Sequence, residues 1–90
     1  MSSCWTYSFT TRALEEYQYF AKTNPAIVRR INQLIMDMML EPKKGLGKPE
    51  QLKGNLTGCW SRRITGEHRL VYRIQETEVE ILSCRFHYDK

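Results

Sequence analysis

A cluster of basic residues is the part of this sequence best suited to chemistry on a phosphate. Residues 43–73 carry eight basic side chains against Glu50 and Glu67, an excess of six positive charges, whereas residues 74–90 are acidic by two. Such an excess attracts polyanions by counterion release. A solvated lysine-rich surface is the alternative, but four of the eight are arginines in strand-like sequence, which favours contact with nucleic acid. The eight are Lys43, Lys44, Lys48, Lys53, Arg62, Arg63, Arg69 and Arg73.

The cysteines give no indication of a metal site or a disulfide framework. There are three, Cys4, Cys59 and Cys84, an odd number at wide spacing, and the chain has only two histidines. This pattern does not match a zinc-ligand spacing. Because each cysteine lies in an apolar, strand-like stretch, we expect reduced thiols that act as small buried hydrophobic side chains. No cofactor is expected.

Two helices are predicted after a first strand. Residues 4–9 alternate between apolar and polar side chains, which is the period of a half-buried strand. From Thr11 the apolar residues fall at steps of three and four, so a helix should run to about Lys22. Asn24 can cap a second helix with Pro25 in its first turn, and Glu41-Pro42 should end that helix.

The second half of the chain predicts a loop and three strands. Residues 42–58 contain four glycines and two prolines without helical or strand period, and we interpret them as a long loop. Strands are expected at 59–64, 68–74 and 79–85, joined by hairpin-like turns. The order β-α-α-β-β-β indicates an α+β fold with both helices on one face of a mainly antiparallel sheet, and the other face open.

The strand period partly predicts which side chains share the open face. If Thr65-Gly66-Glu67 is a three-residue hairpin loop, Arg63 and Arg69 lie opposite each other on one face. A two-residue loop would instead place them on opposite faces. The period of two does not decide between these registers.

Chain length and hydropathy limit the organisation and location of the protein. The 90 residues suffice for one domain with a modest core, so residues 1–90 should form a single domain with a site built on its surface. No apolar run approaches the ~18 residues of a membrane span. The first residues lack the basic start and apolar stretch of a secretory signal. We therefore expect a cytoplasmic protein.

Residues 45–72, GLGKPEQLKGNLTGCWSRRITGEHRLVY, and the terminal CRFHY of residues 84–88 resemble the YoeB/Txe family of toxins from type II toxin–antitoxin systems. The similarity extends to IVRRINQLIMD at residues 27–37 and so covers most of the chain. It implies the RelE-like fold, in which Arg63 and Arg69 share a face.

The resemblance also implies an activity, which is ribosome-dependent cleavage of messenger RNA in the decoding site, with inhibition of translation. In that reaction the 2′-hydroxyl of the RNA is the nucleophile, so DNA would be a poor substrate. The chemistry requires a base for the hydroxyl proton, a cation for the charged phosphorane and an acid for the departing 5′-oxygen. No metal is required.

By residue matching, Glu50 corresponds to the family's general base, Arg69 to its phosphate-stabilising arginine and His87 to its general acid. Without the motif, Glu50 would be read as a solvated loop glutamate and His87 as a surface group near the chain end. Accessory substrate contacts are implied for Lys53, Arg63 and Tyr88. Glu67 and His68 also match the family motif, but we expect them to be structural at the hairpin.

The same resemblance implies partners. It predicts a cognate YefM-like antitoxin, the ribosome and messenger RNA, operator DNA bound only as the toxin–antitoxin complex, and a homodimer. Asp89 and Lys90 extend beyond the family's usual His-Tyr end, and Asp89 could pair with Arg69 or raise the pKa of His87. The alternative function is therefore a catalytically weak or inactive adaptor that binds RNA or ribosome. A gyrase-poisoning toxin of the same fold would lack the Glu50 and His87 pair.

Overall fold

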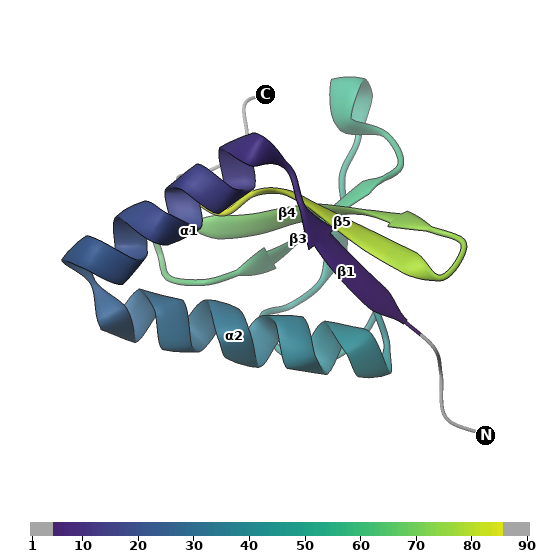
Figure 1. Ribbon diagram of the computed structural model, residues 1–90. Coiled ribbons are helices and arrows are strands. Elements are labelled where there is room, and N and C mark those ends of the chain that lie inside the picture. Colours follow the sequence, from purple (N-terminus) through teal and green to yellow (C-terminus); the bar gives the residue numbers. More distant parts are fainter. Residues whose placement is uncertain (1–4, 86–90) are drawn as a thin grey trace.

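The computed structural model describes residues 5–85 and contains two helices and a five-stranded sheet (Figure 1). In chain order the elements are β1 (Thr6–Phe9), α1 (Thr11–Thr23), α2 (Pro25–Leu40), β2 (Glu50–Gln51), the 3-10 helix η1 (Gly54–Leu56), β3 (Cys59–Arg63), β4 (Arg69–Gln75) and β5 (Glu78–Ser83). No helix among residues 5–85 is long and apolar enough to cross a membrane.

The strands form one mixed sheet in the order β1-β5-β4-β3-β2. β1 runs parallel to β5, and the other neighbours are antiparallel. In the chain, α1 and α2 connect β1 to β2, and both helices lie on one face of the sheet (Figure 1). The predicted α+β fold, with helices on one face of a mainly antiparallel sheet, is confirmed.

The helix boundaries follow from local capping. The Thr10 hydroxyl accepts a hydrogen bond from the Ala13 amide at 3.1 Å, which satisfies one of the free donors at the start of α1. Pro25 occupies the start of α2 as predicted. The predicted side-chain cap by Asn24 is wrong, since its side chain makes no capping hydrogen bond and its backbone carbonyl instead accepts from the Ile27 amide at 3.0 Å.

The main core lies between the helices and the sheet. The even-numbered residues of β3 and β4 face the helices, together with Val79 and Ile81 of β5. Cys84 belongs to the same core, as expected for a small buried hydrophobic side chain. The fully buried apolar members include Ala13, Ile31, Leu34, Met38, Leu70, Tyr72, Val79 and Ile81.

The opposite sheet face is partly covered, contrary to the prediction of an open face. Leu52 and Leu56, from the segment between β2 and β3, pack on Cys59, Val71 and Leu82 in a second small core. The segment predicted as loop therefore contains a two-residue strand and a 3-10 helix. Elements this short have no detectable period in the sequence, and β2 is defined by its pairing with β3.

Arg62 is the main exception to the predicted basic surface. It lies on the helix-facing side of β3, and its side chain is fully buried. Strand alternation explains the difference, because adjacent arginines on a strand point to opposite faces. Of the predicted basic cluster, Arg62 therefore contributes nothing to a nucleic-acid-binding surface.

Candidate active site

Glu50 and Arg69 come together from two strands that flank β3. Glu50 pairs in register with Ser61, and Glu50 Oε1 lies 3.7 Å from Arg69 Nη1. The arginine side chain is 14% exposed and the glutamate side chain 56%. The arrangement thus combines an accessible carboxylate with a largely enclosed guanidinium at the sheet surface.

Arg63 lies beside this pair. Arg63 and Arg69 are direct partners in the antiparallel pairing of β3 and β4, and the Ile64 amide donates to the His68 carbonyl at 3.0 Å. The three-residue loop 65–67 is confirmed, and it places both arginines on one face. Two guanidinium groups at adjacent positions offer forked donors suited to the oxygens of a phosphodiester.

The other predicted site residues are placed differently. Lys53 is exposed and lies immediately before η1, beyond the buried Leu52 that separates it in sequence from β2. His87 and Tyr88 lie outside the described residues. The last described residue, Arg85, follows β5, whose Ser83 pairs with Val71 near the start of β4. The described chain therefore ends at the same end of the sheet as Arg69.

Ser61 is a site residue that the sequence reading missed. It is fully buried, and its hydroxyl accepts a hydrogen bond from Arg69 Nη1 at 3.4 Å. A serine in a strand carries little signal on its own. Ser61 becomes relevant only through its pairing with Glu50 in β2, and because β2 was not predicted, Ser61 was not identified.

Most of the remaining basic side chains of the cluster are exposed at the surface. Lys43 Nζ is 6.0 Å from the centre of the Trp60 ring, within the range of a weak cation–π contact. Arg73 is held by an ion pair with Glu80 at 2.7 Å. The exposed members of the predicted cluster are Lys43, Lys44, Lys48, Lys53, Arg63 and Arg73.

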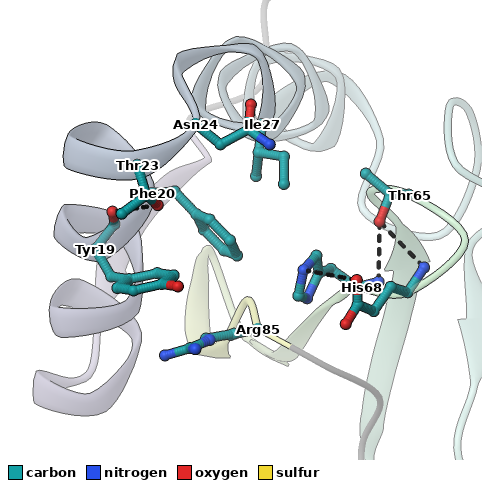
Figure 2. A pocket seen from close by; sticks show the side chains of 9 residues that line it. Tyr19, Phe20, Thr23, Asn24, Ile27, Thr65, His68 and Arg85 are labelled. Atoms are coloured by element: carbon teal, nitrogen blue, oxygen red, sulfur yellow. Dashed lines mark hydrogen bonds and ion pairs between the residues drawn. The ribbon is translucent and has the colours of Figure 1, made fainter.

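A separate hollow of about 500 Å³ lies between the end of α1, the start of α2 and the β3–β4 hairpin (Figure 2). His68 is buried there and meets the edge of the Phe20 ring at a centroid distance of 5.0 Å. The Thr65 hydroxyl accepts from the amides of Glu67 and His68, both at 3.1 Å. The buried ring of His68 is consistent with the structural role expected for it at the hairpin.

Potential metal ligands do not cluster in the described part of the chain. No group of three or more histidine, cysteine, aspartate or glutamate residues within residues 5–85 is arranged to hold a metal ion.

Comparison with known proteins defines the class. A family model described as the YoeB-like toxin of bacterial type II toxin–antitoxin systems matches residues 9–88. Toxin YoeB of Synechocystis is 47% identical over 83 residues, covering 92% of this chain and 96% of the relative. Toxin YoeB of Escherichia coli K12 is 51% identical over 74 residues, covering 82% and 88%.

Solved structures agree with these relatives. A YoeB/ParE toxin from Agrobacterium tumefaciens superposes with a TM-score of 0.90 at 44% identity, covering 92% of this chain and 99% of that one. A YoeB–YefM complex from Staphylococcus aureus gives 0.85 at 44% identity, covering 93% and 98%. A YoeB dimer from the same species gives 0.87 at 41% identity, covering 96% and 100%.

The fold is that of a toxin with the RelE-like fold, as the sequence resemblance implied. The chain belongs to the YoeB-like family of toxins from bacterial type II toxin–antitoxin systems.

Proposed function

We propose that the chain is an endoribonuclease that cuts messenger RNA on the ribosome and so inhibits translation in the cytoplasm. The observation that carries the proposal is the placement of Glu50 beside Arg69, with Arg63 next to it in register. An accessible base next to two phosphate-binding groups is what 2′-hydroxyl attack on an RNA phosphodiester requires.

In the proposed reaction Glu50 removes the proton of a 2′-hydroxyl, and that oxygen forms a bond to the adjacent phosphorus. Arg69 and Arg63 stabilise the charge on the non-bridging oxygens. The bond from phosphorus to the 5′-oxygen breaks, and His87 protonates that leaving oxygen. The products are a 2′,3′-cyclic phosphate and a free 5′-hydroxyl, so no water, metal or cofactor is consumed.

The role of His87 rests on its match to the family motif in the terminal CRFHY, and His87 lies outside the described residues. Lys53 and Tyr88 are proposed as further substrate contacts, the lysine through phosphate and the tyrosine by stacking on a base.

We also propose that a YefM-like antitoxin binds this toxin and that the chain forms homodimers. The Staphylococcus aureus complex and dimer structures support this for relatives of the same fold. The exposed basic side chains would attract an acidic, partly disordered partner. The toxin–antitoxin complex, and not the toxin alone, would then bind operator DNA and repress the operon.

The test is primer-extension mapping of a defined messenger in a purified translation system, with and without ribosomes. Wild type should cut only with ribosomes, and Glu50→Gln and His87→Ala should each slow cleavage by about 10²- to 10⁴-fold. Glu15→Gln, which changes an exposed glutamate of α1, is the matched control and should cleave like wild type.

Three outcomes would decide against parts of this proposal. Ribosome binding without cuts by wild type would identify a non-catalytic adaptor instead. Small losses in both variants would remove Glu50 and His87 from the catalytic roles. If deletion of Asp89 and Lys90 left the pH–rate profile unchanged, the suggested influence of that extension on His87 would be wrong.

A further inference from the structure

The buried guanidinium of Arg62 makes a full set of contacts with the segment that leads to Glu50. Nη2 donates to the carbonyls of Glu41 and Lys44, each at 2.8 Å, and Nη1 donates to the carbonyl of Leu46 at 3.1 Å. One side chain thus binds three backbone carbonyls of residues 41–46.

Asp37 and Tyr72 complete the same network. Arg62 Nη1 donates to Asp37 Oδ2 at 2.8 Å, and Nε donates to the Tyr72 hydroxyl at 3.1 Å. The tyrosine hydroxyl donates in turn to the Pro42 carbonyl at 2.7 Å, and Asp37 Oδ2 accepts from the Leu46 amide at 2.9 Å. We call Arg62, Asp37 and Tyr72 the loop clamp.

The clamped segment packs closely against α2 and β3. At Gly45, whose φ is +118°, a Cβ would collide with the Asp37 carboxylate. At Gly47, whose φ is +79°, a Cβ would lie 2.9 Å from Leu34 Cδ2. The Gly47 carbonyl accepts from the Arg63 amide at 2.7 Å, so the segment is tied to β3 just before β2 begins. Glycine is needed where backbone approaches this closely at positive φ.

We propose that Arg62 is a positioning residue, which with Asp37 and Tyr72 holds residues 41–47 in the conformation that places Glu50 against Ser61 and Arg69. β2 has only two residues, and two ladder pairs cannot fix the position of Glu50 by themselves. The loop clamp, which lies on the helix side of the sheet, provides the additional contacts that hold this segment in place. The effect of the clamp on RNA cleavage rests on the proposed function, whereas its effect on the conformation of residues 41–47 does not.

The geometry explains why arginine is needed. All five N–H donors of a guanidinium can be used in one plane, and here they reach a carboxylate, a hydroxyl and three carbonyls. An ammonium group has three donors and cannot reproduce this pattern. Arg62→Lys should therefore leave carbonyls of the loop without donors, and it also risks unfolding the protein.

The primary test uses Tyr72→Phe and Asp37→Asn, which weaken the clamp and keep the buried arginine. Amide exchange in the full-length chain should accelerate about tenfold at residues 43–50, the factor expected for loss of a hydrogen bond, and stay unchanged in the middle of α1. In the ribosome assay the single-turnover cleavage rate should fall about tenfold or more while the ribosome dissociation constant stays within about twofold.

Ile31→Val is the control for a general loss of stability. Ile31 is fully buried in the main core, so the change should lower the free energy of unfolding without altering the residues of the clamp. It should lower the unfolding midpoint without the local rise in exchange or the loss of cleavage. Cleavage by the clamp variants equal to that of Ile31→Val would overturn the catalytic part of the inference.

Unchanged exchange at residues 43–50 in both clamp variants would overturn the inference entirely. Absence of cleavage by wild type would instead overturn the proposed function, and the exchange measurement would still decide whether the clamp holds the loop. Restoration of slow exchange and cleavage by added guanidinium in an Arg62→Ala protein that folds would support the clamp directly.

Discussion

Glu50 Oε1 and Arg69 Nη1 lie 3.7 Å apart across the buried Ser61 of β3. The two side chains are held unequally, because Arg69 donates to the Ser61 hydroxyl and is mostly enclosed whereas Glu50 is more than half exposed. The arginine is thus the more enclosed member of the pair, and the carboxylate is the more accessible one.

Replacing Arg69 should lower the cleavage rate more than replacing the exposed Arg73 of the same strand. Arg69→Ala should reduce single-turnover cleavage by about 10²- to 10³-fold, the loss typical for removal of one donor to a transition-state oxyanion. Arg69→Lys should recover only part of it. Arg73→Ala is the matched control, since Arg73 pairs with Glu80 and is exposed. Similar losses in all three variants would indicate a general electrostatic effect.

Leu52 should be essential to stability, although it lies in a segment without regular sequence period. It is 4% exposed and belongs to the second core with Cys59 and Val71. Leu52→Ala should lower the free energy of unfolding by about 2–5 kcal/mol, measured by urea denaturation. The matched change Leu40→Ala, at a side chain 77% exposed, should alter it by about 0.5 kcal/mol or less. Equal effects would mean that the second core does not form.

The clamp should make stability sensitive to acid. The Leu46 amide, and then the Arg62 guanidinium, hold the pKa of Asp37 below its usual value. A pKa lower in the folded chain favours folding above the ordinary carboxyl pKa of about 3.9, and this contribution is lost as the pH falls below that value. Urea midpoints between about pH 5 and pH 2 should therefore decline less steeply for Asp37→Asn than for wild type.

The control for the acid experiment is Glu15→Gln, which removes an exposed carboxyl of α1. Its midpoints should decline in parallel with wild type. If Asp37→Asn also declined in parallel with wild type, the Asp37 carboxylate would have no net preference for the folded state.

The thiol of Cys84 should be unreactive toward alkylating reagents in the folded protein. Burial, followed by the nearby Glu16 carboxylate, raises the pKa of its thiol to about 12. The thiolate is the reactive form, so alkylation at pH 8 should be slow until the chain unfolds. Peptide mass spectrometry after iodoacetamide treatment, with and without urea, measures this. Labelling of Cys84 at the same rate in both conditions would contradict its burial.

Hydrophobic period and strong local motifs made much of the fold predictable. The helix at Thr11–Thr23 and the second at Pro25–Leu40 follow from apolar spacing, and Pro25 sets the start of the second. All three later strands were expected within two residues of their observed ends. The register of Arg63 and Arg69 required a family resemblance, because strand alternation alone permits two hairpin loops.

Residue types at short separations were enough to predict the family, the two helices, the four longer strands and the basic cluster. Only the tertiary structure decided that Arg62 is buried while Arg63 is exposed, that Leu52 and Leu56 cover the second sheet face, and that Ser61 lies between Glu50 and Arg69. The physical reason is that these features depend on contacts between distant segments. A two-residue strand is too short to show a period, and strand alternation separates Arg62 from Arg63 without deciding which of the two faces the helices cover.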